Sequence, residues 1–146
     1  TQKVGWKDLD FIIVDMPPGT GDTQLTFSQE IKMDGAIIVS TPQEVALLDV
    51  KRGIKMFDKL GVKILGLVDN MSYFTGDDGK KYKIFGEGGV KRTAKEFGKE
   101  FFGEIPINSE VGKCGDEGKP IVEAYPDHEI SKIYLNLASK IKHQYL

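Results

Sequence analysis

The sequence predicts an α/β fold in which a parallel sheet is sandwiched by helices, and the order of two kinds of segment supports this. Short runs of β-branched and other apolar residues are typical of strands buried on both faces. These runs occupy residues 9–15, 35–40, 62–68 and 101–105. Apolar residues at helical spacing follow each run, and this alternation is typical of parallel sheets because each crossover uses a helix. We expect a single domain over residues 1–146.

The helix after the second strand is predicted most clearly. Thr41 is placed as its N-cap, Pro42 falls in its first turn, and Glu44 completes a capping box. Its apolar stripe consists of Leu47, Val50, Ile54 and Phe57. Gly61 is placed to end the helix. The candidate caps of other helices are Thr20 or Asp22 for the first, Ser109 for a short one, and Asp127 for the last.

Two further features interrupt the alternation of strands and helices. Residues 71–85 have the pattern of a hairpin, with a turn at residues 75–79 and a lysine-rich second arm. We interpret this hairpin as an insertion into the domain. Pro106 is expected to stop the last strand, because proline cannot donate a backbone hydrogen bond.

Composition excludes several classes of function. The chain has 20 basic and 22 acidic residues, for a net charge of −2, so a nucleic-acid partner is not indicated. No apolar run is long enough to span a membrane, and there is no signal-peptide pattern. The single cysteine, Cys114, excludes internal disulfides and favours a reducing, cytoplasmic location.

The most informative stretch is the end of the first predicted strand and the loop that follows it. Asp15 ends the apolar run, and residues 16–22 contain two prolines and two glycines, which force an irregular loop. A carboxylate at this position can hold Mg²⁺ through water, and loop amides can face a terminal phosphate. An aspartate that caps the next helix would give a similar pattern.

Residues 15–22 resemble the second switch of the Mrp/NBP35 (ApbC) branch of the MinD-like P-loop ATPases, which are iron–sulfur cluster carriers. Five further blocks resemble the family in the family's order: residues 39–49, 70–74, 84–89, 103–106 and 116–122. The chain is identified as a member of this family. The resemblance implies a P-loop NTPase fold of the MinD-like type, with ATP and Mg²⁺ as ligands.

The resemblance also implies roles for individual residues. Asp15 would hold Mg²⁺ through water as the switch aspartate, and Gly19 would bring a backbone amide toward the γ-phosphate. Asn70 would contact adenine, although formation of a buried turn explains it nearly as well. Pro106 would line the adenine pocket with main chain. Asp22 is interpreted as a helix cap rather than a catalytic base.

Two departures from the family pattern limit what this chain does alone. It contains no glycine-rich phosphate loop with the G-K-[ST] pattern, and it begins at Thr1 rather than methionine. We therefore expect the carboxyl-terminal portion of an ATPase, with a sheet incomplete at its N-terminal side and exposed strand edges. The chain alone is expected not to hydrolyse ATP.

The second departure concerns iron. The family usually carries Cys-x-x-Cys in the hairpin, whose thiolates from two subunits bridge a [4Fe–4S] cluster. Here those positions fall at Gly76 and Gly79, and glycine cannot ligate iron. Cys114 is interpreted as a packing residue. Asp77 and Asp78 are interpreted as part of a turn rather than as ligands of a hard cation.

The leading hypothesis from sequence is an ATP-dependent iron–sulfur cluster carrier, dimeric in its full-length form, that delivers clusters to apo-proteins. Two other functions stay open. The chain could be a non-enzymatic interaction module that binds a partner through its hairpin or sheet edge. It could also be a MinD/ParA-like positioning ATPase, which would need a membrane-binding tail, but residues 140–146 are only weakly amphipathic.

Overall fold

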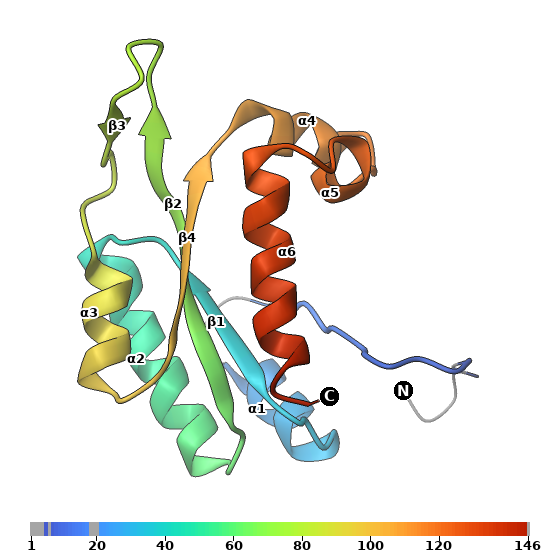
Figure 1. Ribbon diagram of the computed structural model, residues 1–146. Coiled ribbons are helices and arrows are strands. Elements are labelled where there is room, and N and C mark those ends of the chain that lie inside the picture. Colours follow the sequence, from blue (N-terminus) through green and yellow to red (C-terminus); the bar gives the residue numbers. More distant parts are fainter. Residues whose placement is uncertain (1–4, 6, 18–20, 146) are drawn as a thin grey trace.

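The computed structural model describes residues 5, 7–17 and 21–145, and for residues 22–24 it describes the backbone alone. Its helices and strands are α1 (Asp22–Glu30), β1 (Ala36–Ser40), α2 (Glu44–Lys59), β2 (Ile64–Thr75), β3 (Lys81–Tyr82), α3 (Gly89–Glu96), β4 (Phe101–Ile107), α4 (Ser109–Asp116), α5 (Ile121–Ala124) and α6 (Glu129–Lys142) (Figure 1). None of the helices in these ranges is long and apolar enough to cross a membrane.

Three parallel strands form the centre of the sheet. β2 lies between β1 and β4 and pairs in parallel with both. β3 is antiparallel to the far end of β2, where Phe74 pairs with Tyr82. The hairpin exists as expected, and its first arm is the continuation of the 12-residue strand β2. Figure 1 shows this hairpin projecting beyond the rest of the sheet.

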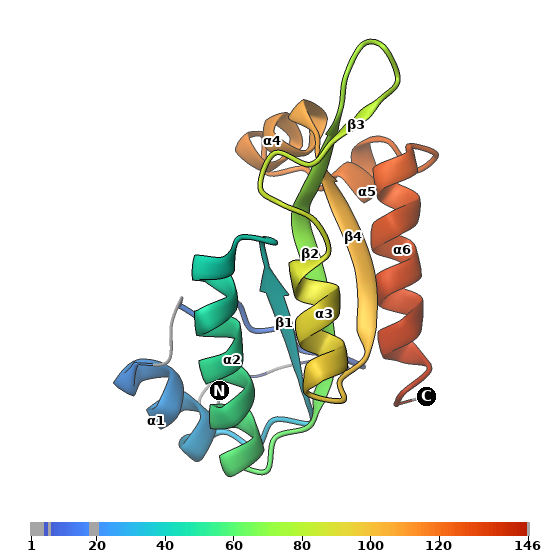
Figure 2. The ribbon, with the colours of Figure 1, turned by 90° about the vertical axis from the view of Figure 1, so that its left-hand side faces the viewer.

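Helices cover both faces of the sheet, which confirms the predicted α/β architecture. Figure 2 shows α2 and α3 on one face of β2 and α6 on the other. On the first face, Ile54, Leu67 and Val90 pack together with no exposed surface. On the second face, Phe102 of β4 packs against Leu137 of α6. Residues 64–68 of β2 form an uninterrupted apolar run, which is typical of a strand that is covered on both faces.

The strand expected at residues 9–15 is wrong. Residues 9–17 have no regular secondary structure, and the apolar side chains of residue 9 and residues 11–14 are 41–85% exposed. A strand needs a neighbour to accept and donate its backbone hydrogen bonds. In the described part of the chain, no strand pairs with this segment. Its apolar sequence alone is therefore not enough to make it a strand.

The predicted capping box of α2 is also wrong. The helix begins at Glu44, so Gln43 rather than Thr41 occupies the N-cap position, without a side-chain cap. The carboxylate of Glu44 pairs with Arg92 of α3 instead, with Oε1 3.1 Å from Nη2. The apolar stripe of α2 and its end before Gly61 are as predicted. An ion pair with a neighbouring helix thus replaces the local cap.

Other element ends differ by one or two residues. Asn108 rather than Ser109 caps α4, and its side chain accepts a hydrogen bond from the N–H of Glu110 at 2.8 Å. His128 rather than Asp127 caps α6. Gly21 occupies the N-cap position of α1, whereas Thr20 lies outside the described residues.

Pro106 does not stop β4, which runs to Ile107. Within the described residues β4 pairs only with β2, so it is an edge strand. Proline is tolerated on an edge strand when its nitrogen points away from the neighbour, because no ladder hydrogen bond is lost.

Candidate functional site

Polar residues meet where the three parallel strands come side by side at their carboxyl ends. Ser40, the last residue of β1, pairs with Asp69 of β2, and Asp69 pairs with Glu104 of β4. Paired residues of neighbouring strands present their side chains on the same face of a sheet. The carboxyl edge of a parallel sheet is where open α/β folds bind ligands. We therefore take this edge as the candidate site.

The two predicted adenine contacts belong to the same edge. Asn70 of β2 pairs with Ile105 of β4, and the buried Pro106 follows Ile105 directly. The hydroxyl of Ser72 donates a buried hydrogen bond of 3.1 Å to the carbonyl of Ile105. This bond holds the two strands together where their register shifts beyond Asn70. Asn70 and Pro106 are thus brought onto adjacent strands.

Asp69 is the most unusual ionisable residue of the site. Its side chain is 1% exposed, and neither carboxylate oxygen has a hydrogen-bond partner among the described residues. Burial removes the carboxylate from water and, with the negative charge of Glu104, raises the pKa of Asp69 to about 6, although Lys83 opposes this shift. A buried carboxyl group without partners favours its neutral form. Sequence reasoning did not single out Asp69.

Lys83 connects this edge to the hairpin. It lies in the segment between β3 and α3, and its ammonium is 3.5 Å from Oε1 of Glu104. The same ammonium lies 5.3 Å from the centre of the Tyr73 ring, and that of Lys81 lies 4.1 Å from it. Tyr73, Lys83, Glu104 and Asp69 therefore form a chain of electrostatic contacts from the hairpin to the sheet.

Asp15 and Gly19 are the residues predicted to face Mg²⁺ and the γ-phosphate. Asp15 is exposed on the segment without regular structure, so its carboxylate is accessible to a hydrated ion. Gly19 lies outside the described residues. No strand pairing brings Asp15 toward Asn70 or Pro106 in the described part of the chain. Within the described residues, Asn70 and Pro106 lie on adjacent strands, and no strand pairing joins Asp15 to them.

The hairpin tip is a closed turn built on Asp78. One carboxylate oxygen of Asp78 accepts a hydrogen bond of 3.0 Å from the N–H of Lys80, and the other accepts one of 2.9 Å from the hydroxyl of Tyr82. These hydrogen bonds, first the backbone one, lower the pKa of Asp78. Asp78 is therefore part of a turn, as the sequence predicted.

A larger side chain is unfavourable at Gly76 and at Gly79, for a different reason at each position. A Cβ atom on Gly76 would lie 2.8 Å from Cε2 of Tyr82 and 3.0 Å from a carboxylate oxygen of Asp78. Gly79 has φ of +74°, which strains any residue other than glycine. The tip is shaped for glycine at both positions.

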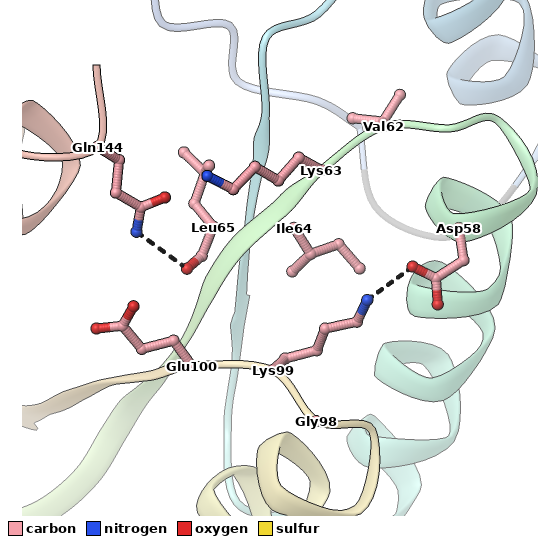
Figure 3. Close-up of a pocket in the computed structure, with 9 residues that line it drawn as sticks. All are labelled: Asp58, Val62, Lys63, Ile64, Leu65, Gly98, Lys99, Glu100 and Gln144. Carbon is pink, nitrogen blue, oxygen red and sulfur yellow. Dashed lines mark hydrogen bonds and ion pairs between the residues drawn. The ribbon is translucent and has the colours of Figure 1, made fainter.

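An open depression of about 480 Å³ lies away from this edge (Figure 3). Its lining comes from the start of β2, the turn between α3 and β4, and the end of the chain. On one side Lys99 points to Asp58, at 2.7 Å, and on the other Gln144 points to the carbonyl of Leu65, at 3.5 Å. These residues precede or begin the strands, so the depression is at the amino edge of the sheet and outside the candidate site.

Comparison with known proteins identifies the family. A family model described as ParA, NUBPL iron-transfer P-loop NTPase, matches residues 1–142. The chain belongs to this family. The match confirms the resemblance to the Mrp/NBP35 (ApbC) carriers that the switch segment and the later blocks suggested.

Curated relatives of the NUBPL iron-transfer family resemble nearly the whole chain. The Arabidopsis thaliana iron-sulfur protein required for NADH dehydrogenase, mitochondrial, is 50% identical over 142 residues, which are 97% of this chain and 45% of the relative. The Aquifex aeolicus iron-sulfur cluster carrier protein is 46% identical over 134 residues, which are 91% of this chain and 37% of the relative. The chain therefore spans less than half the length of these relatives.

Solved structures agree with the fold. A nucleotide-binding protein from Archaeoglobus fulgidus, solved in complex with ADP, is 43% identical and superposes with a TM-score of 0.66, covering 75% of this chain and 45% of that one. The cell division ATPase MinD of Pyrococcus furiosus superposes with a TM-score of 0.71 at 24% identity, covering 92% of this chain and 52% of that one. The second likeness shows the MinD-like fold alone.

The family is described as an iron-transfer family, and the candidate iron ligands of this chain are its single cysteine and its histidine, aspartate and glutamate side chains. Soft thiolates are the usual ligands of iron–sulfur clusters. Cys114 is 4% exposed and packs against Ile121 and Ile130 beneath α6, so its thiol is not accessible to a cluster. Among the described residues, no three His, Cys, Asp or Glu side chains form a group that could hold a metal ion. The described residues do not fit an iron–sulfur cluster.

Proposed function

We propose that this chain is part of an ATP-dependent iron–sulfur cluster carrier in which nucleotide binding and hydrolysis change the affinity for cargo or for recipient apo-proteins. The observation that carries this proposal is the identity of 46–50% with curated iron–sulfur proteins over more than nine-tenths of the chain. Identity at this level over nearly the whole chain supports a shared activity for the complete proteins. The carrier would act as a homodimer with ATP between protomers.

In this proposal the chain supplies the adenine side of the nucleotide site and the metal-binding switch. Asn70 would contact the base with its amide, and Pro106 would line the pocket from the neighbouring strand, which fits the pairing of Asn70 with Ile105, the residue before Pro106. Asp15 would hold Mg²⁺ through water, which fits its exposed carboxylate. Gly19 would turn a backbone amide toward the γ-phosphate. Bound Mg²⁺ offsets the negative charge of the phosphates.

The cluster is the cargo, and this chain's hairpin would not hold it through thiolates. Gly76 and Gly79 fall at the family's cysteine positions, and glycine has no side chain with which to ligate iron. We propose that the hairpin serves to contact a partner rather than to ligate iron. Its exposed aromatic residues Phe74 and Tyr82 support that role.

Nucleotide binding is the direct test. Isothermal titration calorimetry with Mg-ATP is carried out on this chain and on a fusion of the chain to the part of the Archaeoglobus fulgidus protein that it does not span. We expect the fusion to bind Mg-ATP and the chain alone to lack ATPase activity. Asn70→Ala in the fusion should weaken binding about fivefold or more, since a hydrogen bond contributes about 1 kcal/mol.

The matched control is Asn136→Ala, which removes an exposed amide from α6. This variant should bind Mg-ATP as the unmodified fusion does. A fusion that folds, as judged by circular dichroism, but binds no Mg-ATP would contradict the proposal. Such a result, together with nucleotide-independent capture of a partner by the hairpin, would favour the interaction-module hypothesis.

A further inference from the structure

The buried carboxyl group of Asp69 needs an explanation, because unsatisfied buried polar atoms are rare in folded proteins. Both of its oxygens are buried without a hydrogen-bond partner, and its side chain is 1% exposed. Its low exposure leaves little surface through which a ligand or an ion could contact it. A proton is the one species that such a group binds in place.

The surroundings of Asp69 show what a proton there would change. β1 carries no charged residue, and β4 contributes Glu104 directly opposite Asp69. The segment between β3 and α3 contributes Lys83. The ion pair of Glu44 with Arg92, which joins α2 to α3, is exposed. Two carboxyl groups therefore face one ammonium.

We propose that Asp69 is a proton-binding positioning residue that, through Glu104 and Lys83, sets how firmly the hairpin is held to the carboxyl edge of the sheet. When Asp69 is protonated, its hydroxyl can donate to the carboxylate of Glu104 and competes with Lys83 for it. When Asp69 is ionised, two carboxylates attract the ammonium of Lys83, which moves toward them and away from the Tyr73 ring. The hairpin connection is held more tightly in the ionised form.

Asp69 and Lys83 connect two parts of the fold, the candidate nucleotide edge and the segment that leads to α3. Asp69 is followed by Asn70 at the candidate nucleotide edge, and Lys83 is followed within a few residues by the start of α3. Figure 2 shows the β3–α3 connection running back from the hairpin along the sheet toward α3. A change of charge at Asp69 therefore acts on the only described connection that returns the chain from the hairpin to the sheet. The inference does not depend on the proposed nucleotide function.

Nuclear magnetic resonance of the full 146-residue chain tests the inference without nucleotide. The pH is varied from 4 to 8 while the side-chain carboxyl carbon of Asp69 and the methylene groups next to the Lys83 ammonium are followed. The Lys83 signals report distance from the Tyr73 ring through its ring current. We expect both sets of signals to titrate with one shared midpoint near pH 6.

Variants separate this link from other titrating groups. Asp69→Asn should abolish the step in the Lys83 signals, whereas Asp77→Asn, at the exposed hairpin tip, should preserve it. Both histidines are present in the parent chain and in every variant, so any signal that they contribute is common to all of the titrations. Glu104→Gln should lower the midpoint of Asp69, because a like charge is removed.

Three results would overturn the inference. One is an Asp69 carboxyl signal that does not titrate near pH 6. Another is a Lys83 signal that stays constant from pH 4 to 8 while Asp69 titrates. The third is an unchanged Lys83 step in Asp69→Asn.

Discussion

Replacing Asp69 by asparagine should make the protein more stable at neutral pH, and the size of the effect follows from the structure. The folded-state pKa of Asp69 is about 6, against 3.8 for an unperturbed aspartate. A raised pKa means that the folded protein binds the proton more tightly than the unfolded chain does. The stability from this proton is therefore complete below pH 3.8 and is lost as the pH rises through 6.

The shift of about 2 pKa units corresponds to about 3 kcal/mol of unfolding free energy. Relative to low pH, where Asp69 is protonated in both states, linkage predicts that the unfolding free energy is lower by about 0.6 kcal/mol at pH 4 and by about 3 kcal/mol at pH 7.5. Asparagine has nearly the shape of a protonated aspartic acid and its amide can donate to Glu104, so Asp69→Asn avoids the loss. The variant should exceed the parent chain in stability by an amount that grows with pH.

Urea denaturation followed by circular dichroism, at pH 4 and at pH 7.5, measures this difference. Comparing parent and variant at each pH cancels the titration of the other carboxyl groups. Asp77→Asn, which removes an exposed carboxylate, should show no such growth. A parent-to-variant difference that is the same at both pH values, or an Asp69→Asn protein that is less stable at pH 7.5, would refute the electrostatic reasoning.

Two further predictions concern glycines. Gly66→Ala should lower the unfolding free energy by about 1–3 kcal/mol in urea denaturation, because its Cβ would lie 2.4 Å from the buried ring of Phe102. Gly53→Ala should raise the unfolding free energy by about 0.5–1 kcal/mol, because Gly53 lies inside α2 and its Cβ would meet open space. Equal effects of the two variants would contradict the packing argument. The double variant Gly76→Cys with Gly79→Cys should be about 1–3 kcal/mol less stable than the parent chain in urea denaturation, because φ of +74° at Gly79 strains a cysteine and a Cβ at Gly76 would displace Tyr82 or Asp78. An unchanged stability would show that the turn opens without cost.

The sequence predicted five of the six helices, all but the short α5, because their signals are local. Of the four apolar runs expected to be strands, the three after residue 30 are strands. The spacing of Leu47, Val50 and Ile54 determines which face of α2 is apolar whatever it packs against, and these residues are buried as expected. The ends of helices were less predictable. Glu44 has the position of a capping residue, but an arginine from another helix takes its carboxylate. The local sequence around Glu44 could not show that Arg92 of α3 lies beside it.

The candidate site divides in the same way. Asn70 and Pro106 were recognised from short sequence blocks, and their place on neighbouring strands followed from the parallel sheet. Asp69 was missed, although an aspartate directly after an apolar run was the same signal that drew attention to Asp15. The sequence could not show that one carboxylate is buried opposite Glu104 and the other is exposed.

By itself, the sequence determined the class of fold, the family, and two of the residues at the sheet's carboxyl edge, Asn70 and Pro106. Only the tertiary structure decided that residues 11–14 do not form a strand and that Asp69 lacks a hydrogen-bond partner. Helix periodicity and turn preferences act between residues close in the chain, so sequence is enough for them. Strand pairing and desolvation depend on what lies beside a residue in space, and that is settled only when the whole chain has packed.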